Sequence, residues 1–173
     1  WQMGLLNPEE WAAKWIGYPR DLPENQIRVI DEQTGETQTL YTEPNPSPML
    51  RCVFSLKEKP IHATIYTTAL GLYELYLNGQ KVGDHILAPE WTDYRQRIQY
   101  QTYDVTSQLH VGKNAVGAIL GEGWYAGLVG LVGTRQYGSR LGFLLQMEIE
   151  FADGSKETII SDESWKGTVA GPI

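Results

Sequence analysis

The sequence predicts an all-β domain, an antiparallel jelly-roll β-sandwich with a short N-terminal helical lead-in. Short apolar or alternating runs are separated by turn residues about every 8–12 positions, and amphipathic helical periodicity is almost absent. The runs are unevenly spaced, with long loops at residues 83–96 and 121–139, which favours a jelly roll over a regular meander. We expect residues 1–20 to be a lead-in that joins a preceding domain, and residues 21–173 to be the sandwich.

The lead-in carries the residue types of a helix start. Residues 7–10 read Asn-Pro-Glu-Glu, which combines an N-cap residue, a proline at the first helical position and acidic residues in the first turn. We expect a short helix that ends near Lys14. Trp11 and Trp15 then share one face of this helix, and we expect both to fix the segment to the domain.

The expected strands are rich in β-branched, aromatic and aliphatic residues. They are residues 27–30, 37–41, 49–56, 61–69, 72–77, 80–82, 97–105, 115–120, 140–151 and 157–161. Asn78-Gly79 predicts a hairpin with a type I′ turn, because both residues tolerate a positive φ. Residues 106–109 predict a helical turn, and the proline-rich segment 43–48 is excluded from a central strand.

Composition indicates a folded globular chain and excludes several functions. The 173 residues are 42% hydrophobic and 20% charged, which is typical of a domain with a buried core. A net charge of -7 with 14 scattered Lys and Arg residues excludes a nonspecific nucleic-acid binder. The apolar runs are too short to span a membrane. The single cysteine, Cys52, excludes an internal disulfide and is expected to be buried and inert.

The first residues, Trp1 to Leu6, have neither the basic region nor the cleavage site of a signal peptide. They also lack an initiator methionine, so we expect a fragment of a longer protein. The sequence leaves the localisation of that protein open among cytoplasm, periplasm and secretion.

The two long loops hold the residues best suited to ligand binding. Each places Trp and Tyr beside a carboxylate, and long loops collect at the ends of a sandwich, where the two can meet. Aromatic rings pack on the apolar C–H face of a sugar, while planar polar groups bind its hydroxyls. The candidate carbohydrate-binding residues are Trp91, Tyr94, Trp124 and Tyr125 for stacking, and Asp93, Arg95, Glu122 and Asn78 for hydroxyl contacts.

The same residues have simpler structural interpretations. Trp91 and Trp124 can act as plugs that stiffen the ends of the sandwich, and the turn alone accounts for Asn78. Hydrolysis needs two carboxylates about 5–10 Å apart, but 21 acidic residues make a loop pair expected by chance. We therefore assign no catalytic residue. The histidines lack zinc-ligand spacing, so no metal ligand is assigned, and calcium held by loop oxygens stays open.

Five segments together resemble one known family. They are Tyr66–Gly79, Val82–Asp84, Leu87–Tyr94, Tyr100–Thr106 and Gly121–Tyr125. The set resembles the N-terminal accessory domain of bacterial α-L-rhamnosidases of glycoside hydrolase family 78, over roughly residues 50–165. This resemblance implies a galactose-binding-like jelly roll within a larger enzyme, whose (α/α)6 catalytic barrel lies further along. In some relatives a similar module binds rhamnose with calcium, and we carry none of the ligands of that site over to these residues.

Two functions are therefore favoured over a third, a self-contained hydrolase, which an assay for release of rhamnose would detect. The first is a non-catalytic accessory domain that binds L-rhamnose-containing glycans or supports the active site of the barrel. The alternative is a structural module that packs against other domains of the same polypeptide and has no sugar site. Neither involves nucleic acid or a membrane. In both, the tryptophans near the chain ends are expected to contact neighbouring domains, namely Trp1, Trp11, Trp15 and Trp165.

Overall fold

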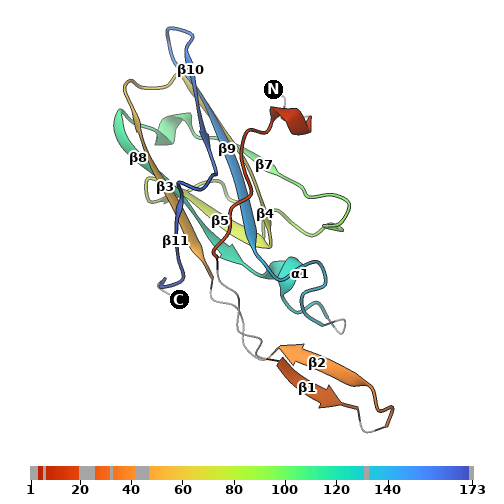
Figure 1. The fold of residues 1–173 in the computed structure, drawn as a ribbon. Coiled ribbons are helices and arrows are strands. Elements are labelled where there is room, and N and C mark those ends of the chain that lie inside the picture. The colour runs from red at the N-terminus through yellow and green to blue at the C-terminus, as the bar shows by residue number, and fades with distance from the viewer. Residues whose placement is uncertain are drawn as a thin grey trace.

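The fold is an antiparallel β-sandwich, shown in the computed structural model of Figure 1. The structure describes residues 4–5, 7–19, 26–31, 33–41, 47–130 and 133–171. The all-β prediction is confirmed, because two antiparallel sheets form the body of the domain and helix is confined to single turns. Within the described residues, no helix is long and apolar enough to cross a membrane.

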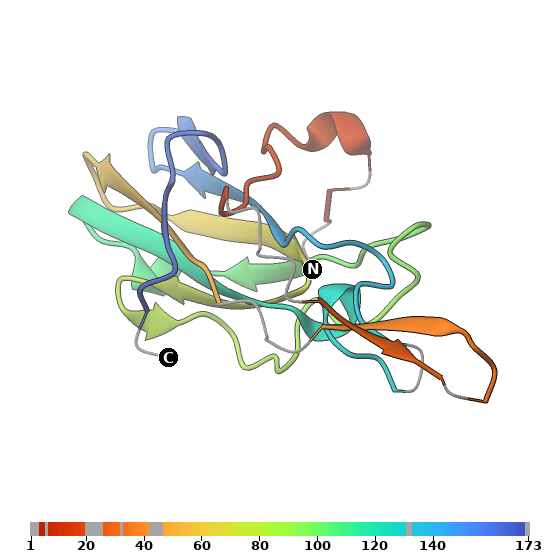
Figure 2. The ribbon, with the colours of Figure 1, turned by 60° about the horizontal axis from the view of Figure 1, so that its bottom comes forward.

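The two sheets contain strands from all parts of the chain. The five-stranded sheet has the order β11-β3-β8-β5-β6, with β3 (Met49–Leu56), β5 (Leu72–Leu77), β6 (Gln80–Lys81), β8 (Gly112–Gly121) and β11 (Lys166–Thr168). The four-stranded sheet has the order β10-β9-β4-β7, with β4 (His62–Leu70), β7 (Gln101–Asp104), β9 (Gly142–Glu150) and β10 (Lys156–Ile160). A separate hairpin of β1 (Gln26–Ile30) and β2 (Thr37–Tyr41) extends away from both sheets in Figures 1 and 2.

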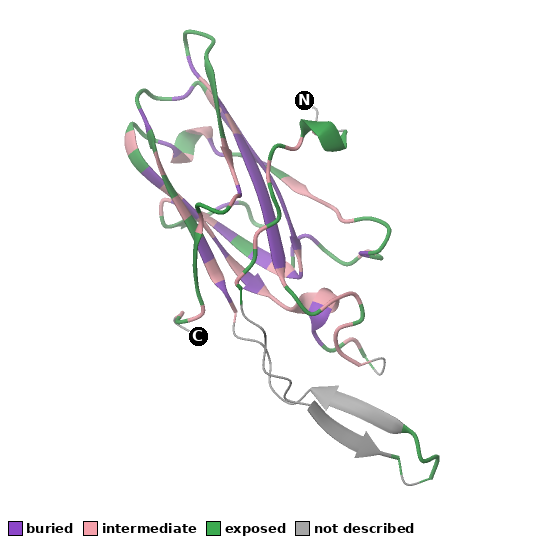
Figure 3. Cartoon of the chain, in the orientation of Figure 1, coloured by how far each residue is buried: buried purple, intermediate pink, exposed green. Residues whose placement is uncertain are grey.

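Alternation along the strands decides which side chains enter the core. In β8, Val116, Ala118 and Leu120 are buried, while the residues between them are partly exposed, as the two-residue period of a strand requires. The inner faces of the two sheets supply one continuous cluster of buried residues. The rings of Phe143 on β9 and Tyr73 on β5, for example, meet across it with centroids 5.9 Å apart. Figure 3 shows this buried layer along the strands.

The strand prediction is confirmed in most places and wrong in three. The strand expected at 97–105 is reduced to β7, because the amides of Gln96 and Arg97 both donate to the carbonyl of Asp93 and close a turn. The sequence pattern does not predict β11, which is a short edge strand on β3. It also misses α1 (Gly123–Ala126), a single helical turn inside the second long loop. The jelly-roll connectivity itself stays a prediction.

The lead-in helix is shorter than expected. Only η1 (Pro8–Glu10), one turn of 3-10 helix, is formed. The amide of Ala12 donates to Gln146 Oε1 at 2.7 Å, and the amide of Lys14 donates to the carbonyl of Ser161 at 2.8 Å. Because these amides bind the sheet, they cannot continue a helix, and the lead-in runs along the four-stranded sheet instead.

The lead-in covers the outer face of the four-stranded sheet. The Trp11 ring lies edge-on against Tyr66 of β4 and Tyr100, with centroids 6.5 and 5.5 Å away. Trp165 packs on Phe143 at 5.8 Å and donates its indole N–H to a backbone carbonyl. Trp11 therefore fixes the lead-in to the domain, as expected, and Trp165 also packs within it, while their contact with neighbouring domains stays a prediction. Trp15 is 45% exposed, and Trp1 lies outside the described residues.

Candidate functional site

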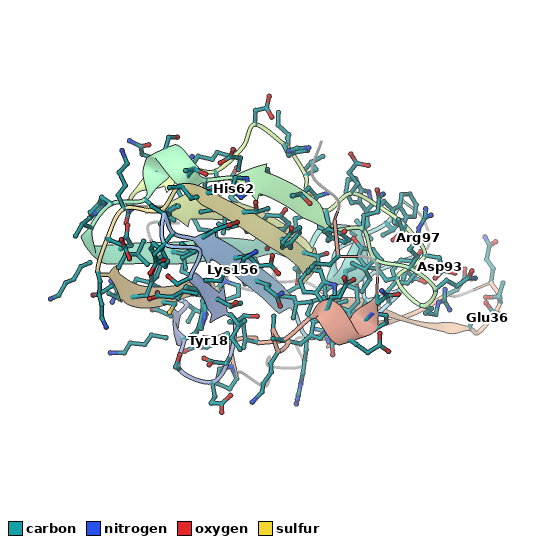
Figure 4. All side chains as sticks on the ribbon, turned by 90° about the horizontal axis from the view of Figure 1, so that it is seen from above. Tyr18, Glu36, His62, Asp93, Arg97 and Lys156 are labelled. Carbon is teal, nitrogen blue, oxygen red and sulfur yellow. The ribbon has the colours of Figure 1, made fainter. Side chains whose placement is uncertain are left out.

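The two long loops meet at one end of the sandwich. The loop after β6 carries Trp91, and α1 after β8 carries Trp124. Their rings are parallel, with centroids 6.0 Å apart and planes 4° apart. The Asp93 and Arg97 side chains lie beside this end in Figure 4, well away from His62 on β4. The loops are therefore in the arrangement that sequence reasoning expected.

A second layer of rings supports the stacked pair. Tyr94 meets Tyr125 edge-on at 5.3 Å and Tyr137 at 5.1 Å. The Trp91 indole N–H donates to the Tyr137 hydroxyl at 3.3 Å. We call these five residues, Trp91, Tyr94, Trp124, Tyr125 and Tyr137, the loop cluster. Sequence reasoning missed Tyr137, although its place in the second long loop could have indicated it.

The members of the loop cluster differ in exposure. Trp91 is 51% exposed, whereas Tyr94 is 8% exposed and donates its hydroxyl to the carbonyl of Glu90 at 3.2 Å. Burial raises the pKa of Tyr94 and of Tyr125 above the ordinary tyrosine value, so both stay neutral. Tyr94 therefore packs inside the cluster, whereas Trp91 has a ring face that is accessible to solvent.

The stacked pair can offer a ligand only an outer face. A sugar held between two rings needs a van der Waals contact on each side, or about 7–8 Å between the rings in total. The 6.0 Å between the centroids of Trp91 and Trp124 is too short for this. A ligand would therefore lie on the exposed side of Trp91, with Trp124 behind it.

Charged groups border the cluster. Asp93 Oδ1 accepts hydrogen bonds from the Arg95 amide at 3.2 Å and from Arg95 Nε at 3.3 Å, and Asp93 Oδ2 accepts one from Gln96 at 3.2 Å. The Arg95 guanidinium lies 5.2 Å from the centroid of the Tyr137 ring. Glu122 is half-buried and directly precedes α1, where its carbonyl accepts the Ala126 amide. The site thus has an aromatic floor and a polar edge.

The backbone of both loops holds unusual conformations. Leu87, Glu90 and Arg135 have φ values of 60°, 76° and 59°, which cost a non-glycine residue roughly 1 kcal/mol or more each. Gly138 is required by a close approach, because a Cβ there would overlap the Tyr125 hydroxyl. Such local cost persists only where the surrounding structure imposes it, and it is typical of functional loops.

Asn78 is the one candidate that the structure places elsewhere. It follows β5 at the end opposite Leu72, about 20 Å along the strand from the α1 end. With φ values of 53° and 80°, Asn78 and Gly79 form the expected left-handed turn. The Asn78 amide donates to Gln108 O at 2.9 Å and to Asn114 Oδ1 at 2.8 Å, and its Oδ1 accepts the Ala115 amide. The Asn78 side chain holds this turn and lies apart from the loop cluster.

The family resemblance raised a calcium site, for which the described residues offer no cluster of acidic side chains. Within these ranges, no three Asp, Glu, His or Cys side chains are grouped to hold a metal ion. Both oxygens of Asp93, the carboxylate beside Trp91, already accept hydrogen bonds from Arg95 and Gln96.

Comparison with known sequences points to one family. Residues 58–173 match the sequence model of the family described as the alpha-L-rhamnosidase N-terminal domain. An alpha-L-rhamnosidase of Streptomyces avermitilis is 54% identical over 125 residues, which cover 72% of this chain and 12% of that protein. One from Formosa agariphila is 37% identical over 175 residues, covering 99% of this chain and 18% of that protein. The chain thus spans less than a fifth of these relatives.

Solved structures give the same result. The alpha-L-rhamnosidase of Aspergillus terreus matches with a TM-score of 0.80 and 39% identity over 95% of this chain and 18% of its own. The Streptomyces avermitilis enzyme, complexed with L-rhamnose, matches with a TM-score of 0.71 and 50% identity over 73% of this chain and 12% of its own. A Pleurotus ostreatus lectin in complex with GalNAc, at a TM-score of 0.52 and 23% identity, covers 89% of this chain and 38% of its own and shares the fold alone.

Proposed function

The chain belongs to the α-L-rhamnosidase N-terminal domain family, and from this premise we propose that it is a non-catalytic accessory domain that binds a rhamnose-containing glycan at its loop cluster. The observation that carries the proposal is the exposed ring of Trp91, stacked on Trp124 and bordered by Asp93 and Arg95. Glycan bound there would lie at the domain surface, where the catalytic barrel of the longer enzyme can reach it.

The chemistry of binding follows from the residues of the cluster. The C–H face of a deoxy sugar such as rhamnose removes apolar surface from water when it packs on the Trp91 ring. Trp124 fixes the angle of that ring, so that little side-chain entropy is lost on binding. At the polar edge, Asp93 accepts hydrogen bonds from sugar hydroxyls, and Arg95 donates hydrogen bonds to them. A site of this size supports weak, millimolar-range affinity, which is sufficient when a second module of the same polypeptide binds the same glycan.

The absence of catalysis is part of the proposal and has its own support. A glycosidase needs one carboxylate to donate a proton and another to act as a base or nucleophile. Asp93, the carboxylate beside Trp91, accepts three hydrogen bonds from Arg95 and Gln96 within its own loop. The open side of Trp91 also lacks the enclosure that excludes water from a reacting bond.

Calorimetric titration of the chain with L-rhamnose tests the binding. The parent chain should release heat that saturates at millimolar sugar, and Trp91→Ala should abolish it. Trp15→Ala is a matched control, because Trp15 is a 45% exposed tryptophan that belongs to the lead-in and to neither long loop. Absence of heat from the parent chain at tens of millimolar sugar overturns the proposal, as does equal binding by Trp91→Ala.

A structural packing role is the second candidate. It is favoured by the contacts that these residues already make within the domain, since Tyr94 is buried and Arg95 lies over the Tyr137 ring. In that case Trp91 would be covered by the following domain of the longer enzyme. A blue shift of Trp91 fluorescence on extending the chain, without any response to rhamnose, would favour packing over glycan binding.

A further inference from the structure

A second surface, on the opposite side of the core from the lead-in, has its own geometry. Five residues stand directly opposite one another across the five strands of the larger sheet: Lys81, Tyr76, Gly117, Arg51 and Lys166. All five belong to the outward-facing set, because the alternate residues of the same strands fill the core. They form one row across the outer face.

Gly117 makes the middle of this row hollow. Neighbouring strands are about 4.8 Å apart, so the Cα atoms of Tyr76 and Arg51 are separated by about 10 Å with Gly117 between them. Because glycine has no side chain, the gap stays open and forms the floor of a groove of about 590 Å³. Met49 and Ile119 of the next row extend this floor. The volume is within the range of about 300–1,000 Å³ that is typical of small-molecule sites.

One wall of the groove is cationic. Arg51 and Lys166 are direct cross-strand partners, so their side chains start about 5 Å apart. Like charges in this position destabilise a sheet. Within the described part of the chain, neither has an ion-pair partner, and no carboxylate lines the groove. An anion placed between them would offset this repulsion.

The opposite wall is the aromatic ring of Tyr76, which hydrogen bonding holds in place. The Tyr76 hydroxyl donates to Glu74 Oε2 at 2.9 Å, and Glu74 Oε1 forms an ion pair with Lys81 at 2.8 Å. These bonds fix the ring at the edge of the groove. They also engage the carboxylate of Glu74, the acidic residue of the adjacent row, with Lys81 instead of Arg51.

We propose that this groove binds an acidic saccharide, with a sugar ring against Tyr76 over Gly117 and its carboxylate between Arg51 and Lys166. The net charge of the chain is -7, so the chain as a whole repels anions. Attraction of an anion to the groove would therefore come from the local charges of Arg51 and Lys166. The choice of a saccharide rests on the proposed accessory role, whereas the groove and its charges do not. In Figure 3 the ribbon of β11 is coloured as exposed, and β3 has exposed positions between buried or half-buried ones.

Amide shifts in an NMR titration locate the site. D-glucuronate should shift the Gly117 and Gly167 amides, which both line the groove, and leave the loop cluster unchanged. D-glucose is the uncharged counterpart and should leave both glycines unchanged. L-rhamnose reports separately on the loop cluster, so failure of one site is distinguishable from failure of the other. Equal shifts with glucose overturn the role of the carboxylate, and equal shifts with acetate overturn the role of the sugar.

Substitutions test the assignment of the cationic wall. Arg51→Gln and Lys166→Gln should each weaken glucuronate binding about tenfold, because each removes a charge-assisted contact. Lys156→Gln is the matched control, since Lys156 is an exposed strand lysine on the other sheet. Unchanged affinity in both groove variants contradicts the proposal. The proposal is also contradicted if glucuronate binds the groove in the isolated chain but not in the full enzyme, because another domain covers the groove there.

Discussion

Trp91 and Trp124 come from different loops and lie parallel, with their ring centroids 6.0 Å apart. This contact joins the two long loops into one unit at the end of the sandwich. The half-exposed Trp91 ring rests on Trp124 of α1, and α1 directly follows the central strand β8. The loop cluster is therefore a rigid surface, and its energetic coupling can be measured.

The stacking of the two tryptophans should appear as a coupling free energy. Trp91→Ala, Trp124→Ala and the double variant form a cycle, and we expect a coupling of about 0.5–1.5 kcal/mol in the free energy of unfolding. Urea unfolding followed by far-UV circular dichroism measures it independently of the lost fluorophores. Strict additivity of the two single changes would contradict the stack.

Asn78 should matter for stability and not for sugar binding. Asn78→Ala removes the side-chain hydrogen bonds with Gln108, Asn114, His110 and the Ala115 amide. It also leaves alanine, whose side chain makes no hydrogen bond, at a φ of 53°. We expect the free energy of unfolding to fall by about 2–4 kcal/mol. Asn78→Gly relieves the backbone cost and should lose about 1 kcal/mol less. A rhamnose affinity that falls in a folded Asn78→Gly variant would place Asn78 in the sugar site after all.

Ser161 should fasten the lead-in to the sandwich. Its hydroxyl accepts the Leu145 amide at 3.0 Å and donates to the Lys14 carbonyl at 2.7 Å, in a fully buried position. Ser161→Ala leaves both backbone groups without this partner and should cost about 2–4 kcal/mol of unfolding free energy. Ser164→Ala is the exposed control. Limited proteolysis should cleave residues 7–18 faster in Ser161→Ala, and equal cleavage in the two variants would contradict the role.

Alkaline pH should destabilise the domain through Tyr73. Burial, followed by the hydrogen bond and repulsion from Tyr103, raises the pKa of Tyr73 well above its ordinary value of 10.0. The folded state therefore keeps a proton that the unfolded state loses, so stability is complete below pH 10 and decreases above it, by up to about 1.4 kcal/mol per pH unit. Tyr73→Phe should reduce this slope in urea unfolding between pH 9 and 11. An unchanged slope would show that other groups dominate.

The cationic wall should carry a small cost in stability. Because Arg51 and Lys166 are opposite each other on β3 and β11, Arg51→Gln should raise the free energy of unfolding by about 0.2–0.5 kcal/mol at low salt. The gain should shrink in 1 M NaCl, where charges are screened. Thermal unfolding at both salt concentrations measures this difference, and a loss of stability at low salt would contradict the repulsion.

Much of the fold could be read from local sequence. Apolar and β-branched runs predict where β3, β4, β5 and β9 lie, and Asn78-Gly79 identifies its turn, because both depend on neighbouring residues alone. The lead-in could not be read in this way. Its residues favour a helix locally, but its amides pair with Gln146 and Ser161, which are more than a hundred positions away.

The sequence by itself determined that this is a β-sandwich domain, and that Trp91 and Trp124 stand in its long loops. Only the tertiary structure decided what those residues do. Trp91 stacks on Trp124 and donates a hydrogen bond to Tyr137, and Asn78 lies at the other end of β5. The tertiary structure also brings Tyr76, Gly117 and Arg51 into one row. The physical reason is register: cross-strand pairing joins positions by hydrogen bonds between distant segments, and no local pattern encodes which of them become neighbours.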